Sequence, residues 1–273
     1  MAPAALALAL GAAALHAGWN VLLARSRDVR AATTVALLVG VVSFAPLAAV
    51  SWRVEAAAIP WVVASALLEL VYYFLLTAAY SRSDLSLVYP IARGVAPVLV
   101  LVGATLVGVM LGPWQALGVV LVGGGVLLVR GLVGPVDGKG VALALTIAAT
   151  IAGYTLVDNE GIEHASALAY LELVLLPVAA AALIAYAVAG RLASVRAEVG
   201  WSALVAGVGS FAAYALALLA LSLAPAAAVA AVRETSILVA VALGAIVLRE
   251  SVSPARIVGA TLVVAGVVLI ATT

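Results

Sequence analysis

Long apolar runs separated by short polar breaks extend along the whole chain. A helix that crosses a membrane needs about 20 consecutive, mostly apolar residues. Runs of this kind, bounded by charge, proline and glycine, predict ten spanning helices. They cover residues 4–24, 31–51, 58–80, 86–108, 113–130, 138–158, 165–188, 199–222, 226–248 and 254–271. The pattern therefore predicts an all-α integral membrane protein with ten transmembrane helices.

The composition agrees with this pattern. Hydrophobic residues make up 67% of the chain and charged residues 9%, whereas a soluble domain is about half apolar and about a quarter charged. The net charge of +1 gives no reason to expect a nucleic-acid partner. The absence of cysteine excludes disulfides and thiolate metal sites. We therefore expect a multi-pass protein of the inner or plasma membrane, in a bacterium, whose surroundings are the lipid bilayer.

The basic residues in the breaks are distributed unevenly. Ten of the thirteen Lys and Arg residues lie in breaks after odd-numbered spans, and only Arg53 lies in a break after an even-numbered span. The positive-inside rule places the ten on the cytoplasmic side. With ten spans, both termini then face outward.

The two halves of the chain resemble each other. The segment GPWQALGVVLVGGGVLLV at 112–129 aligns with SPARIVGATLVVAGVVLI at 253–270, and YYFLLTAAYS at 72–81 aligns with AYALALLALS at 213–222, both at an offset of 141. We therefore expect two five-helix repeats, residues 1–130 and 131–273. Because five is odd, the second repeat crosses the membrane in the opposite sense, and inverted repeats of this kind recur in transporters.

Four stretches carry a resemblance to a known family. LRESVSPARIVGATLVVAGVVL and GPWQALGVVLVGGGVLLV resemble the ends of EamA-type repeats in the drug/metabolite transporter superfamily, and LHAGWNVLLARS and SDLSLVYPIARG resemble one branch of it. The resemblance implies a carrier, usually an exporter of amino acids, drugs or other small metabolites. It also implies a central cavity lined by the first, third, fourth, sixth, eighth and ninth helices.

Two features depart from the family pattern. The family often has a glutamate at the end of the fourth helix of a repeat, which Glu250 matches, but the first half has Val109 there. The family also usually keeps both termini in the cytoplasm, whereas the loop charges place them outside. The orientation therefore stays open.

Charged side chains inside the predicted spans are the candidates for a binding site. A charge at the bilayer centre costs about 2.5–3.5 kcal/mol on insertion scales, so it normally faces a partner or a watery cavity. We expect Arg93, Glu69, Arg233 and Glu234 to recognise charge on a substrate or to couple transport to an ion. Helical spacing adds a polar and aromatic lining, made of His16, Trp19, Asn20, Tyr72, Tyr89, Tyr154 and Tyr214.

A purely structural role for the arginines is the alternative. Arg93 would then pair with Glu69, and Arg233 with Glu172 or Glu234. We expect instead that Arg93→Ala loses transport and largely retains folding. Pro90 and Pro97 flank Arg93, which predicts a kink in this helix.

These observations predict a secondary transporter of a small organic molecule. A mixture of arginine and glutamate suits an amino-acid-like or other zwitterion, and export would be driven by protons or by substrate exchange. Efflux of lipophilic or quaternary cations is the alternative, because tyrosine and tryptophan rings with carboxylates suit a cation. No phosphate-binding GxxxxGK[ST] occurs, so ATP is not the expected energy source. An intramembrane enzyme is less expected, because metalloproteases and many lipid transferases need His/Asp clusters or an HExxH helix and only two histidines are present, and a membrane scaffold is less expected because it would not need so many buried charges. We expect no catalytic residues, cofactor or metal. The sequence leaves open whether a second copy of the chain binds through the spans at 113–130 and 254–271.

Overall fold

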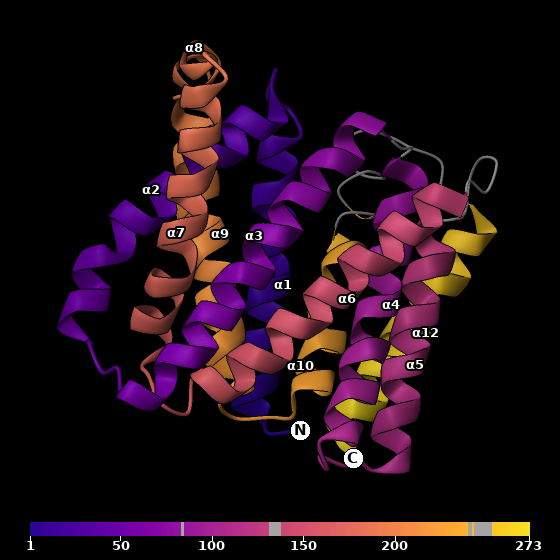
Figure 1. Ribbon diagram of the computed structural model, residues 1–273. Helices are drawn as coiled ribbons and strands as arrows, with labels where there is room; N and C mark the ends of the chain where they lie inside the picture. The colour runs from indigo at the N-terminus through magenta and orange to yellow at the C-terminus, as the bar shows by residue number, and fades with distance from the viewer. Residues whose placement is uncertain (83–84, 131–137, 240–241, 243–252) are drawn as a thin grey trace.

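The computed structural model is a bundle of helices (Figure 1). It describes residues 1–82, 85–130, 138–239, 242 and 253–273, without the side chains of residues 77, 80–82, 85–87, 89, 90 and 130. The described helices are α1 (Pro3–Leu23), α2 (Val29–Val50), η1 (Ala56–Ala58), α3 (Ile59–Arg82), α4 (Leu85–Leu106), α5 (Pro113–Arg130), α6 (Gly138–Gly161), α7 (Ala167–Val188), α8 (Leu192–Ala197), α9 (Trp201–Leu221), α10 (Ala226–Arg233) and α12 (Pro254–Thr272). No strand occurs among these residues.

The helices are long and apolar enough for a membrane. Seven described segments could cross a bilayer by length and composition, and two shorter apolar helices cover Ile91–Leu106 and Pro113–Val129. Large apolar side chains are exposed on the outside of the bundle, for example Val50 and Val188 at 90% and 84%. Exposed apolar surface on this scale needs lipid as its solvent. The fold fits a multi-pass membrane protein.

One predicted span differs in the structure. A single helix was expected over 226–248, but α10 ends at Arg233 and helix resumes at 236. Backbone N–H groups of Glu234 and Thr235 bond three residues back, to Ala231 and Val232, at 3.1 and 3.0 Å. Such tight 3₁₀-type turns within a helix often mark functional positions. The helix over this predicted span is therefore interrupted at Glu234 and Thr235, and most of the span beyond residue 239 lies outside the described residues.

The two prolines of the fourth predicted span lie inside one helix. Helix α4 continues past Pro90 and Pro97 to Leu106, so the prolines do not end it. A bend around Arg93 stays a prediction.

Helices α5 and α12 pack closely through glycines (Figure 1). A Cβ atom added to Gly118 would lie 2.7 Å from the carbonyl oxygen of Gly266, and one added to Gly125 would lie 2.6 Å from that of Gly259. Such contact between backbones is possible only without side chains. The glycines shared by the two halves therefore pack against each other within one chain.

We expect Gly125→Val to destabilise the protein. The new side chain would meet the backbone of α12, and overpacking of this kind typically costs about 1–3 kcal/mol. Gly124→Val is the matched control, because a Cβ atom there meets nothing within 4 Å. Thermal unfolding of the two purified variants in detergent tests this. Equal melting temperatures would show that the α5–α12 contact is looser than the structure indicates.

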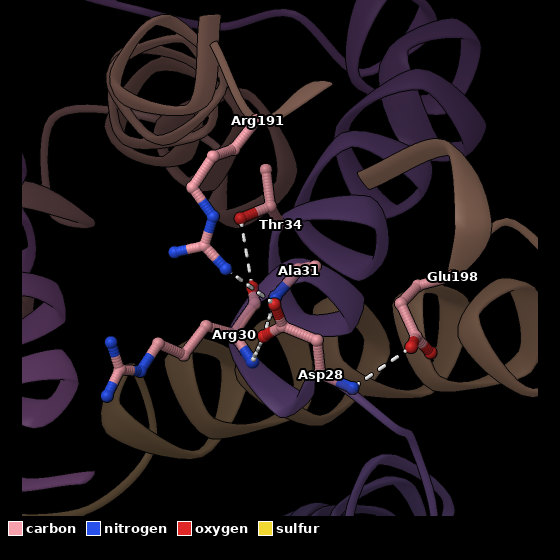
Figure 2. Close-up of polar contacts among 6 residues, drawn as sticks. All are labelled: Asp28, Arg30, Ala31, Thr34, Arg191 and Glu198. Carbon is pink, nitrogen blue, oxygen red and sulfur yellow. Dashed lines mark hydrogen bonds and ion pairs between the residues drawn. The ribbon is translucent and has the colours of Figure 1, made fainter. Parts of the chain in front are cut away.

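Polar contacts join the two halves of the chain at one face of the bundle. The backbone N–H of Asp28, which caps α2, donates to Oε1 of Glu198 at 3.0 Å, and Nη2 of Arg191 lies 3.4 Å from Oδ2 of Asp28 (Figure 2). Oδ1 of Asp28 accepts from the backbone N–H groups of Arg30 and Ala31, both at 3.1 Å (Figure 2). Asp28 thus ties the start of α2 to the connection around α8.

A second connection joins the halves at the opposite face. The backbone N–H of Glu55 donates to the carbonyl oxygen of His164 at 2.9 Å, and that of Ser166 donates to the carbonyl oxygen of Arg53 at 2.7 Å. The imidazole Nδ1 of His164 also lies 3.7 Å from Oε2 of Glu55. The segment before α3 is therefore held against the segment between α6 and α7.

Candidate functional site

A buried ion pair joins α4 to the break after α10. Nε of Arg93 donates to Oε2 of Glu234 at 3.1 Å, and Nη2 of Arg93 lies 3.0 Å from Oε1 of Glu234. The two side chains are 9% and 7% exposed. Two parallel contacts of this kind form a bidentate pair between the planar guanidinium and the carboxylate. Arg93 therefore pairs with Glu234. The structural alternative had expected Arg93 to pair with Glu69.

Arg233 lies beside this pair but is engaged differently. Its guanidinium carbon lies 5.9 Å from the centre of the Tyr214 ring on α9. No described carboxylate lies within ion-pair distance of Arg233, so the pairings expected with Glu172 or Glu234 are not formed in the described residues. The two arginines thus have different neighbours. Glu234, in the turn after α10, contacts Arg93, and the adjacent Arg233 lies over the Tyr214 ring.

Asp158, in the last turn of α6, accepts three hydroxyl hydrogen bonds. Ser65 of α3 donates to Oδ1 at 2.5 Å, Tyr170 of α7 donates to the same oxygen at 3.0 Å, and Tyr214 donates to Oδ2 at 2.5 Å. Asp158 is 1% exposed. Buried carboxylates persist where donors satisfy their oxygens. One carboxyl thereby connects four helices.

Glu69 is the second buried carboxyl of this region. It lies on α3 one turn beyond Ser65 and is 8% exposed. It faces Asp158, the hydroxyl of Tyr214 and the guanidinium of Arg233. No ion pair of Glu69 is formed with another described residue. Glu69 and Arg233 are therefore opposite charges that share one neighbourhood without a direct bridge.

Three tyrosine rings line the same region. The ring centres of Tyr72 and Tyr154 are 6.0 Å apart, and those of Tyr154 and Tyr214 are 6.2 Å apart. The rings come from α3, α6 and α9. We call Glu69, Tyr154, Asp158, Tyr214 and Arg233 the central cluster. It presents both signs of charge next to aromatic faces.

The residues predicted on α1 fall into two groups. His16 lies within electrostatic range of Arg93 and Arg233. Trp19 is placed edge-on to His16 at 5.0 Å and also packs against the apolar contact between α1, α2 and α9. The Asn20 amide donates to the carbonyl oxygen of His16 in its own helix at 2.7 Å. His16 therefore borders the arginines, while Asn20 is turned back onto its helix.

Most of the predicted charged and aromatic residues thus meet, but three residues do not join them in the described part of the structure. The side chain of Tyr89 and all of Glu250 lie outside the described residues. Glu172 is buried on α7 with its Oε2 atom unpartnered, away from the central cluster. Asp158, Ser65 and Tyr170 were not among the residues selected from the sequence. The spacing of Ser65 and Glu69, and of Tyr154 and Asp158, by four residues was the available signal.

The arrangement suits recognition of charge more than metal chemistry. Among the described residues, no three His, Cys, Asp or Glu side chains are grouped so that they could hold a metal ion. The central cluster offers a cation, two carboxyls and aromatic rings instead. Such groups can bind an anion, an ammonium group or a proton.

Comparisons with known proteins give a family and a fold. Residues 138–272 match the family model described as the EamA-like transporter family. One solved structure, described as "Crystal structure of protein", is 14% identical, with 100% of this chain and 97% of that chain covered and a TM-score of 0.78. At this identity the likeness shows the fold alone. No curated protein shows significant sequence similarity to the chain.

Proposed function

Because residues 138–272 belong to the EamA-like transporter family, we propose that this chain is a secondary carrier that exports a small zwitterion, such as an amino acid. One observation carries the choice of substrate class. Arg233 and Glu69 are opposite charges near one tyrosine cluster, and neither forms an ion pair with a described residue. A zwitterion would supply the missing partner to both at once.

The pairing of helices supports ten spans in two inverted repeats. The contact of α1 with α9 corresponds to that of α6 with α3 when the halves are exchanged, and α5 packs on α12. Arg93 and Glu234 are also 141 residues apart, which is the offset between the aligned halves. An ion pair between equivalent positions is expected where an inverted repeat brings its two halves together.

The two faces of the bundle support an orientation. The face around α8 carries most of the basic loop residues, such as Arg25, Arg27 and Arg196. Among the loop arginines and lysines that the structure describes, only Arg53 lies on the opposite face. The face around α8 is then cytoplasmic.

Efflux of a lipophilic cation is the second candidate. The rings of Tyr72, Tyr154 and Tyr214 together with two carboxyls favour it, because aromatic faces attract cations. Arg233 opposes it by like charge. A homodimer through α5 and α12 would use other faces than those of Gly118, Gly125, Gly259 and Gly266, because these glycines pack within the chain.

We expect an amino-acid-like zwitterion to raise the melting temperature of the purified wild type but not of Arg233→Gln. A metabolite panel with thermal unfolding as readout tests this, since a ligand that binds only the folded state stabilises it. Arg196→Gln is the matched control, because Arg196 is exposed on α8. Stabilisation only by organic cations would favour the second candidate. An equal response of the wild type and Arg233→Gln would remove Arg233 from the site.

A further inference from the structure

The two tyrosine hydroxyls that bond Asp158 each have an alternative acceptor. The Tyr170 hydroxyl, which donates to Asp158 at 3.0 Å, also lies 3.3 Å from the carbonyl oxygen of Trp61. The Tyr214 hydroxyl, which donates to Asp158, also faces Glu69. Each hydroxyl carries a single proton, so it can serve only one acceptor fully at a time. Both hydroxyls could therefore turn away if Asp158 took up a proton, and neither would be left without a partner.

Glu69 occupies the other end of this chain of groups. In the observed arrangement the proton of Tyr214 goes to Asp158. The Tyr214 oxygen can then accept a hydrogen bond from Glu69 only when the Glu69 carboxyl carries a proton. A buried carboxyl without an ion-pair partner is also least costly in its neutral form. Asp158 is satisfied as a carboxylate, whereas Glu69 is suited to hold a proton.

We propose that Asp158 and Tyr214 form a proton relay that loads Glu69, the proton-binding site of the carrier. The inference rests on the proposed transport function for its purpose. A proton arriving on Asp158 lets the Tyr214 hydroxyl turn to an unprotonated Glu69. Tyr214 then gives its proton to Glu69 and takes the one on Asp158, so one proton moves and Tyr214 is unchanged.

The relay leads toward one face of the membrane. Asp158 is in the last turn of α6, Trp61 is in the first turn of α3 and Tyr170 is in the first turn of α7. All three helix ends lie at the lower end of the bundle in Figure 1. This is the face poor in basic loop residues, hence the outer face. Protons from outside would thus reach Glu69, as export in exchange for protons requires.

The charged and titratable surroundings of Glu69 fit this role. They are Asp158 and Tyr154 on α6, Tyr214 on α9 and Arg233 on α10. Tyr170 on α7 bonds Asp158 and also lies within electrostatic range of Glu69, while Arg93 on α4 is engaged by Glu234. Arg233 is therefore the cation nearest to an unprotonated Glu69. Release of the proton would leave a carboxylate that Arg233 or a substrate ammonium can stabilise.

Infrared spectroscopy of the purified full-length protein tests the relay without any substrate. At neutral pH, the difference spectrum between the wild type and Glu69→Gln should contain the C=O stretching band of a protonated carboxyl, and Glu172→Gln should retain this component. After transfer to D₂O, the shift of this band reports proton exchange at Glu69. Tyr214→Phe should slow that exchange on the order of a hundredfold, since a positioned proton-transfer group contributes about 10²–10⁴.

The controls separate the relay from folding and from transport. Tyr73→Phe removes a tyrosine hydroxyl from α3, the helix that carries Glu69, and should leave the exchange rate unchanged, because this hydroxyl bonds Thr34 of α2 at 3.0 Å. Asp158→Asn gives a second test, with the exchange again slowed. A difference spectrum without this band, or exchange that is unaltered in both Tyr214→Phe and Asp158→Asn, would overturn the proposal. Either failure leaves the metabolite panel as an independent test of the carrier.

Discussion

Arg93→Ala should destabilise the protein by about 3–5 kcal/mol, because it leaves Glu234 as an uncompensated buried charge. Glu234→Ala should be equally damaging, since it strands the guanidinium. The double variant Arg93→Met/Glu234→Met should be much closer to the wild type, because replacing a whole buried pair by apolar groups is often neutral or stabilising. Thermal unfolding and size-exclusion chromatography in detergent measure the three variants.

This expectation replaces the one drawn from sequence, in which Arg93→Ala loses transport with folding largely retained. The two contacts of 3.0 and 3.1 Å to Glu234 make Arg93 structural as well. Arg196→Ala, on exposed α8, controls for loss of positive charge. If the double variant were as unstable as the single ones, packing of the long side chains, and not their charges, would hold α4 to the turn after α10.

The double variant also separates folding from recognition. A stable double variant that still responds to the metabolite panel would place charge recognition on Arg233 and Glu69 alone. A stable variant that no longer responds would add the Arg93–Glu234 pair to the binding site. Either result comes from folded protein, which the single variants do not guarantee.

The helices could largely be predicted from sequence because bilayer thickness dictates the length of an apolar run. The α5 and α12 helices, for example, begin at the prolines that bounded the predicted spans. The break after Arg233 could not be predicted in this way. The segment Arg-Glu-Thr-Ser contains neither proline nor glycine, and its 3₁₀-type turn lies where Glu234 contacts Arg93.

The site shows a similar division. Helical spacing predicts which side chains share a face of one helix, and Glu69 with Tyr72 follows that rule. It does not give the rotation of one helix against another, which decides that Arg93 meets Glu234 rather than Glu69. Asp158 was not selected from the sequence, because nothing in one helix shows that the paired segments before α3 and after α6 lie over its end.

Asp158→Ala should be the second severe substitution. It removes the acceptor of hydroxyls from α3, α7 and α9, and hydrogen bonds to a charged group contribute about 1.5–3 kcal/mol each. We therefore expect a loss of at least about 3 kcal/mol in stability, reduced because Tyr170 can turn to the Trp61 carbonyl. Thermal unfolding in detergent measures it.

The neighbouring carboxylate provides the matched control. Glu160 lies two residues further along α6 and is exposed, so Glu160→Ala should change the melting temperature little. Asp158→Asn retains one acceptor oxygen in the same place and should fall between the two. The order Ala, Asn, wild type follows from the number of hydroxyls that keep an acceptor. Equal stability of Asp158→Ala and Glu160→Ala would mean that the four helices hold together without the shared carboxylate, and that Asp158 is kept for proton transfer alone.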